Sequence, residues 1–278
     1  MVVLFGLVSQ FGDVWFLFLL GGVLYVAGEY APRWRLDRRR GLFVFALVLT
    51  HVAFIGLLKG FFVLPRPPGA ADPVAVGSVP PPLGTVVGDV TTATGPGFPS
   101  GHALGTTMVW GGLALSMERW SVRLQAGVVG TVVGLVSLSR LVLGVHYLVD
   151  VVVGAALGLV VLWVIYGLSD AGTDPGRVLG VAVAFGALGL VQHATIDSAA
   201  ALGGAVGGWL VWRLTARSVK PHPSNWREVL VGFGILAAAG VFFGAVYALE
   251  LPFPATFAAT ALAVGAVVGA PLVGERLM

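Results

Sequence analysis

The sequence predicts an all-α protein, a polytopic bundle of about nine membrane-spanning helices. Hydrophobic residues make up 57% of the 278 residues and charged residues only 10%, and the mean hydropathy is +0.95. This balance is typical of integral membrane proteins. Apolar runs of roughly 20 residues, the length that crosses a bilayer, also recur along nearly the whole chain. These two observations predict the fold class.

The candidate spans follow one another with short polar connections. They occupy residues 13–30, 41–58, 101–117, 123–139, 147–168, 177–192, 198–214, 228–249 and 254–273. The first segment, MVVLFGLVSQFGDVW, lacks the basic start and the small-residue cleavage site of a secretory signal, so we expect it to be retained. In the last spans, small residues four apart, such as Gly203 with Gly207 and Gly240 with Gly244, favour close helix packing in lipid. Packing within one chain is the default interpretation, and a homodimer interface is left open.

The positions of lysine and arginine predict the topology. Five of the 16 cations lie in PRWRLDRRR, between the first two spans, which marks that loop as cytoplasmic by the positive-inside rule. The N-terminus is then extracytoplasmic, the C-terminus is cytoplasmic, and most later cations also lie on the cytoplasmic side. This distribution indicates a membrane protein and not a nucleic-acid binder, despite a net charge of +3 and a pI near 9.6. The absence of cysteine excludes disulfides and thiolate metal sites.

Three cations, Lys59, Arg66 and Arg140, lie on the outer side against this bias. Cations near membrane depth are costly unless paired, so we expect an anionic partner. The start of the span at 101–117 carries PSGH, and His146 lies at the outer start of the next span but one. Helix N-termini bind anions, and the simplest ligand for two such ends and three cations is a phosphate. Alternatively, each cation extends to lipid headgroups as an ordinary anchor.

His146 and Asp150 are four residues apart, so their side chains share one face of a helix. A carboxylate in this position can accept an imidazole N–H, fix the tautomer and stabilise the imidazolium that forms when the other nitrogen attacks. We interpret the pair as a nucleophile and its orienting partner. A helix-capping ion pair is the alternative, but it does not account for an acid one turn inside an apolar helix.

Three motifs together resemble the signature of the type 2 phosphatidic acid phosphatase (PAP2) superfamily. They are KGFFVLPRP from Lys59, PSGH ending at His102, and SRLVLGVHYLVD over residues 139–150. Their order, spacing and sidedness agree with the family, and the resemblance covers roughly residues 41–168. It implies a PAP2-like catalytic core within residues 1–168 and additional C-terminal helices in residues 169–278.

The resemblance implies a metal-independent membrane phosphatase, without a cofactor, that acts on a lipid phosphate or a polyprenyl diphosphate at the extracytoplasmic face. In the family, the residue matching His146 forms a phosphohistidine, the one matching His102 is the general acid, and the one matching Asp150 is the partner of the nucleophile. The phosphate-binding positions match Lys59, Arg66, Ser100, Gly101 and Arg140.

Other functions remain compatible with this pattern. The same site would serve a lipid phosphotransferase that delivers the phosphoryl group to an alcohol. A transporter for an anion or lipid is a third alternative, which the scarcity of ionisable groups deeper in the spans argues against. Vanadate-dependent haloperoxidases have a similar pocket but are soluble proteins. The outer loop at 67–98 either covers the site or is a passive connector.

Overall fold

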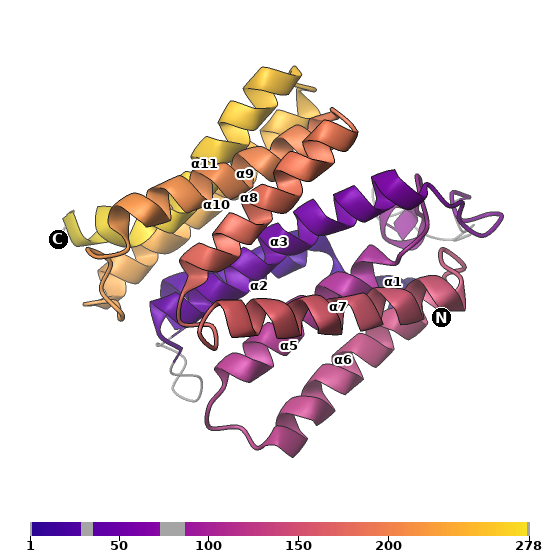
Figure 1. Cartoon of the computed structure of the whole chain (residues 1–278), viewed down its shortest axis with the longest axis horizontal. Helices are drawn as coiled ribbons and strands as arrows, with labels where there is room; N and C mark the ends of the chain where they lie inside the picture. Colours follow the sequence, from indigo (N-terminus) through magenta and orange to yellow (C-terminus); the bar gives the residue numbers. More distant parts are fainter. Residues whose placement is uncertain (1, 29–35, 73–86, 277–278) are drawn as a thin grey trace. The chain divides into compact units, whose positions relative to one another are not determined.

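The computed structural model describes residues 2–28, 36–72 and 87–276, and these residues form helices and connecting segments without a β-strand. The all-α prediction is therefore confirmed (Figure 1). The elements are α1 (Val2–Ser9), the 3-10 helix η1 (Gln10–Gly12), α2 (Val14–Ala27), α3 (Arg38–Phe62), α5 (Gly101–Ser116), α6 (Val122–Val142), α7 (Leu148–Leu168), α8 (Pro175–Gln192), α9 (Ile196–Thr215), α10 (Trp226–Ala248) and α11 (Phe253–Arg276).

Each of the nine predicted spans coincides with one of these helices, apart from small shifts at the ends, and residues 29 and 30 of the first span lie outside the described residues. Six of the described helices are long and apolar enough to cross a membrane, and the bent pair of Val2–Gly12 with Val14–Ala27 provides a seventh if it forms one span. By contrast, α5 has 16 residues, which is short for a bilayer, and α9 is rich in glycine and alanine. The number of spans stays a prediction.

The chain divides into two compact units, and neither is continuous in sequence. Unit 1 comprises residues 1–17 and 58–163, and unit 2 comprises residues 18–57 and 164–278. The boundaries lie inside α2, α3 and α7. The predicted division into a catalytic core and additional C-terminal helices, at residue 168, stays a prediction.

Unit 1 contains α5, α6 and α7, which lie side by side in Figure 1, with α1 packed on α6. The contact between α7 and α5 is very close because Gly154 and Gly158 of α7 face α5. A Cβ atom at Gly154 would lie 2.6 Å from the carbonyl oxygen of Ser100, and one at Gly158 would lie 2.8 Å from that of Leu104. Larger residues would separate the two helices, and with them the start of α5 from the start of α7.

The N-terminal segment forms a bent helix pair that the sequence did not predict. Residues before the expected first span are helical, and α1 with η1 meets α2 at an angle of 47°. The bend packs against α5: Gly12 faces Thr106 so closely that a Cβ atom would collide with the threonine hydroxyl. Nearby, the indole N–H of Trp110 donates to the carbonyl oxygen of Phe11 at 3.0 Å. These contacts fix the bend, including Asp13, against the first turns of α5.

Unit 2 contains the C-terminal helices, in which α9 packs on α8 and α11, and α11 also packs on α10. The predicted small-residue packing is confirmed for Gly203 and Gly207 of α9, because a side chain at either would collide with a backbone carbonyl of α11. Gly240 and Gly244 of α10 do not pack in this way within one chain, and the homodimer alternative stays open for them. In the described part of the chain, a Cβ atom at these two positions has no neighbour within 4 Å.

One end of unit 2 carries a buried ion pair. Arg38, counted as a loop cation in the sequence, is the first residue of α3, is 3% exposed and pairs with Glu228. Glu228 also accepts a hydrogen bond from the backbone N–H of Ser224 at 2.7 Å. Arg38 is therefore a packed residue whose charge is neutralised by Glu228 from α10, and the cytoplasmic location of this loop stays a prediction. The nearby cations Arg33 and Arg35 lie outside the described residues.

Candidate active site

The segment SRLVLGVHYLVD forms a tight turn between α6 and α7. Gly144 has φ +68, a left-handed conformation that favours glycine at a helix C-terminus. The backbone N–H of Gly144 donates to Leu141 at 3.0 Å, and that of Val145 donates to Arg140 at 3.2 Å. These two bonds form a Schellman motif. The motif ties the backbone of Arg140 to the residue that precedes His146, so the turn sets the spacing of the two side chains.

His146 is held between a donor and an acceptor. Its Nδ1 lies 3.2 Å from Oδ2 of Asp150, and its Nε2 lies 3.1 Å from Nη1 of Arg66. A guanidinium can only donate, so we assign the proton to Nδ1, where it is donated to Asp150, and a lone pair to Nε2. Asp150 also accepts from the backbone N–H of Tyr147 at 2.9 Å, so it caps α7 as well as contacting the imidazole. The carboxylate of Asp150 therefore makes the contacts that both interpretations require, one with the imidazole of His146 and one that caps α7.

The environment of His146 disfavours its charged form. Burial lowers the pKa of His146 far below the ordinary value of 6.5, and the positive charges of Arg66, Arg140 and Lys59, followed by His102, lower it further. The imidazole therefore remains neutral in the unliganded site, with its Nε2 lone pair available.

Arg66 lies in the segment that follows α3, and its side chain contacts both the α6–α7 turn and the end of the outer loop. Its Nη1 donates to the carbonyl oxygen of Val145 at 2.9 Å, next to His146. Its Nε lies 3.1 Å from the carbonyl oxygens of both Thr94 and Gly95, near the far end of the outer loop. The described ends of the loop thus hold Arg66 over the α6–α7 turn. Residues 73–86 of that loop lie outside the described residues.

The start of α5 lies beside the start of α7. Ser100 is fully buried and caps α5, since its hydroxyl accepts from the backbone N–H of Ala103 at 3.4 Å. The backbone N–H of Ser100 donates to the carbonyl oxygen of Asp150 at 2.9 Å. Gly101 is the first residue of α5. This places the positive end of the α5 dipole next to the His146–Asp150 pair.

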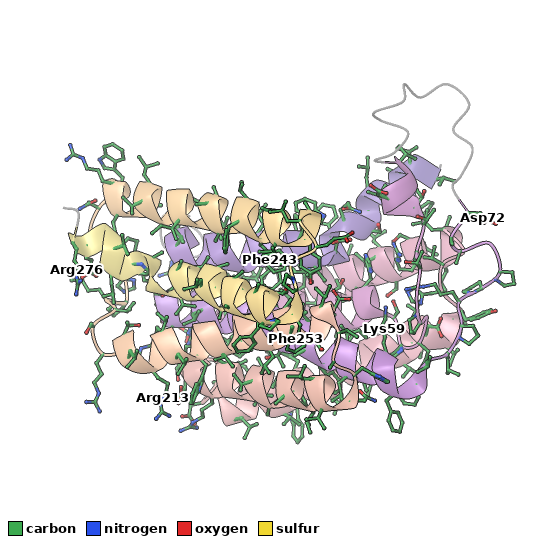
Figure 2. All side chains as sticks on the ribbon, turned by 90° about the horizontal axis from the view of Figure 1, so that it is seen from above. Lys59, Asp72, Arg213, Phe243, Phe253 and Arg276 are labelled. Carbon is green, nitrogen blue, oxygen red and sulfur yellow. The ribbon has the colours of Figure 1, made fainter. Side chains whose placement is uncertain are left out.

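Two cations of the site have no carboxylate partner among the described residues. Arg140 is 4% exposed, and its Nε is buried without a hydrogen-bond partner. Lys59 lies in the last turn of α3 (Figure 2), and within the described ranges its side chain forms no hydrogen bond or ion pair. A buried cation without a carboxylate partner, such as Arg140, is costly, so the site is suited to a multiply charged anion.

Asp13 is a residue of the site that the sequence interpretation missed. Its Oδ2 lies 3.6 Å from Nε2 of His102, in the first turn of α5. That Nε2 is buried and has no hydrogen bond to any other described residue. The signal in the sequence was an acid, in SQFGDVW, at the edge of the first apolar span, where an unpaired charge is costly.

All eight predicted site residues lie in unit 1. The contacts connect Arg66, His146, Asp150 and Ser100 directly, and the charges of Lys59, Arg140 and His102 act on His146. The described residues contain no group of three or more His, Asp or Glu side chains that could hold a metal ion.

Comparisons with known proteins agree with the motifs. Residues 40–173 match the family model of the PAP2 superfamily. Phosphatidylglycerophosphatase B of Bacillus subtilis (strain 168) is 34% identical over 82 residues, which cover 26% of this chain and 39% of that protein. The chain thus matches about two-fifths of the length of this curated relative. No solved structure matches the chain. The matched residues 40–173 hold all eight predicted site residues, so this part of the chain is similar to the PAP2 superfamily.

Proposed function

We propose that this protein is a membrane phosphatase that hydrolyses a lipid phosphate or a polyprenyl diphosphate through a phosphohistidine on His146. The observation that carries the proposal is the pair of partners on His146, with a donor-only guanidinium at Nε2 and a carboxylate at Nδ1. The family and the likeness to a phosphatidylglycerophosphatase support a lipid phosphatase in the coarser sense.

In the first step, the phosphoryl oxygens bind to Lys59, Arg66 and Arg140 and to the backbone N–H groups at the start of α5. Arg66 then donates to the phosphate in place of Nε2, which frees the lone pair of His146. Nε2 attacks phosphorus while the bond from phosphorus to the leaving oxygen breaks, and His102 donates a proton to that oxygen. Asp150 stabilises the imidazolium of His146, and the three cations stabilise the charge on the phosphoryl oxygens.

In the second step, a water molecule attacks the phosphohistidine. His102, now neutral, accepts a proton from the water as the new P–O bond forms. The N–P bond breaks, its electron pair returns to Nε2 of His146, and inorganic phosphate leaves. The enzyme is then restored with His102 charged and His146 neutral. The positive pocket and positioned amides supply the charge stabilisation that metal ions supply in other phosphoryl-transfer enzymes, so the proposed reaction needs no metal.

The proposed location is the extracytoplasmic face of the membrane. In unit 1, Arg119 and Arg123 lie near the α5–α6 connection, whereas the α6–α7 turn with His146 is at the opposite end of α6. In unit 2, Arg213 and Arg276 lie at one end of the helices and Phe253 at the other (Figure 2). The positive-inside rule assigns the arginine-rich ends to the cytoplasm. A site at the outer end can receive a headgroup phosphate while the lipid chains remain in the bilayer.

Purified protein in detergent provides the test. We expect release of inorganic phosphate from at least one of phosphatidylglycerol phosphate, phosphatidic acid and a polyprenyl diphosphate, and none from the His146→Ala variant. Near-normal turnover by His146→Ala would refute the assignment. Transfer of phosphate to an added alcohol in place of water would indicate a phosphotransferase, and lipid movement across vesicles without phosphate release would indicate a transporter.

A further inference from the structure

The bent N-terminal helix pair places a carboxylate against His102, outside the three motifs and outside the matched residues 40–173. Oδ2 of Asp13 faces Nε2 of His102 at 3.6 Å, an ion-pair distance slightly longer than a hydrogen bond. Contacts between functional groups are often long in unliganded enzymes and tighten when substrate brings the charged state. The pair is partly shielded, since the side chains of His102 and Asp13 are 21% and 34% exposed.

The position of Asp13 is fixed by packing and not by the ion pair alone. Gly12, one residue before it, is pressed against Thr106 of α5, and the carbonyl oxygen of Phe11 accepts from Trp110 of the same helix. The carbonyl oxygen of Asp13 accepts from the backbone N–H of Leu17 in the first turn of α2, at 3.0 Å. The carboxylate is thus held near the first turn of α5 from both sides of the bend.

A purely structural role for Asp13 would be to cap α2. The structure separates this role from the contact with His102, because each uses a different oxygen. Oδ1 accepts from the backbone N–H of Trp15 at 3.3 Å, which is a helix cap, while Oδ2 faces the imidazole. Asparagine or serine at this position can keep an acceptor for Trp15 while removing the charge from His102.

We propose that Asp13 is a positioning residue that keeps a proton on Nε2 of His102, so that Nδ1 is the nitrogen that exchanges a proton with the reacting oxygen. The inference rests on the proposed function, in which His102 is the general acid. With Nε2 buried against Asp13, Nδ1 is the ring nitrogen left for the substrate. Charged His102 then donates its Nδ1 proton to the leaving oxygen, and neutral His102 accepts the water proton at the same nitrogen. Asp13 stays ionised throughout and stabilises each imidazolium.

The first experiment compares two substrates with the variants Asp13→Asn and Asp13→Ser. An alkyl phosphate lipid needs a proton on its leaving oxygen, whereas p-nitrophenyl phosphate releases a stable anion. We expect kcat for the alkyl phosphate to fall by about tenfold or more in both variants, with little change in KM and a change of less than about threefold for p-nitrophenyl phosphate. Adding either variant to His102→Ala should cause no further loss. An equal loss on both substrates, or additive losses with His102→Ala, would overturn the proposal.

The matched control is Asp37→Asn. Asp37 caps α3 through Oδ1, which accepts from the backbone N–H of Arg40 at 2.9 Å, and it belongs to unit 2. This variant makes the same chemical change at a helix cap and should leave both substrates unaffected. A loss like that of Asp13→Asn would show that the effect comes from capping and would contradict the proposal.

The second experiment does not depend on activity. Histidine labelled with 15N in detergent micelles reports which ring nitrogen carries the proton, and the His102 signals are assigned by their absence in His102→Gln. We expect neutral His102 to carry its proton on Nε2 in the wild type and to shift toward the Nδ1 form in Asp13→Asn, whose amide can donate to Nε2. An unchanged tautomer would refute the role of Asp13. If the wild type hydrolyses neither substrate, the proposed function fails while this measurement still decides the inference.

Discussion

Replacing Asp150 by asparagine removes the negative charge that faces Nδ1 of His146 at 3.2 Å. Both side chains are almost fully buried, so water screens their interaction very little. At this distance and an effective dielectric constant of about 20, a carboxylate and an imidazolium attract each other by about 5 kcal/mol. The imidazolium forms only as His146 attacks, so the loss falls on the transition state. Since about 1.4 kcal/mol is tenfold in rate, we expect Asp150→Asn to lower kcat by about three to four orders of magnitude.

Single-turnover measurement of phosphohistidine formation, on purified wild type and variant, isolates the affected step. The side-chain oxygen of asparagine can still accept from the backbone N–H of Tyr147, so the cap of α7 and the melting temperature should change little. A well-folded Asp150→Asn protein that forms the intermediate at more than about a tenth of the wild-type rate would refute the electrostatic role assigned to Asp150.

Four further predictions follow from the same contacts. Burial lowers the pKa of His146, and nearby positive charges, of which Arg66 contributes most, lower it further. Arg66→Gln should therefore raise the pKa of His146 and move the acidic limb of the pH profile of kcat/KM to higher pH. An acidic limb that does not move would count against this coupling between Arg66 and His146. Gly144→Ala places a Cβ atom on a residue with φ +68 and should destabilise the α6–α7 turn by about 1 kcal/mol, measured as a lower melting temperature; an unchanged melting temperature would contradict the strain. Glu228→Ala leaves Arg38 buried without its main partner and should lower the free energy of unfolding by about 3 to 5 kcal/mol, measured by thermal or chemical unfolding. A decrease below about 1 kcal/mol would mean that water reaches the arginine. Vanadate, which mimics the transferring phosphoryl group, should inhibit and EDTA should not, and the opposite pair of results would indicate a metal enzyme.

The sequence was sufficient for features that depend on local spacing. His146 and Asp150 are four residues apart on one helix face, and the structure connects them at 3.2 Å. The cations Lys59, Arg66 and Arg140 stand out in the sequence because they oppose the topological bias, and their charges all act on His146. Apolar runs likewise gave the helices, because a span in lipid must satisfy its own backbone hydrogen bonds.

Contacts between distant segments could not be predicted in the same way. The pairing of Asp13 with His102 depends on a bend of 47° and on the close packing of Gly12 against Thr106. No periodic pattern in the sequence predicts either feature. The burial of Arg38 depends on Glu228, which is distant in the chain. Small-residue pairs also look alike in sequence. Among the described residues, a side chain at Gly207 would collide with α11 and one at Gly244 would meet no neighbour, and tertiary packing alone makes this difference.

The tight turn before His146 restricts how the length of this region can vary. One extra residue between His146 and Asp150 would rotate the carboxylate by about 100° around α7, away from the imidazole. One extra residue between Arg140 and Val145 would break the two backbone bonds that close the end of α6. An insertion should therefore disturb the catalytic geometry least in the connection between α5 and α6, at the opposite end of α6 from His146. Chains with altered length between Ser139 and Asp150 should lose turnover even when each motif residue is retained.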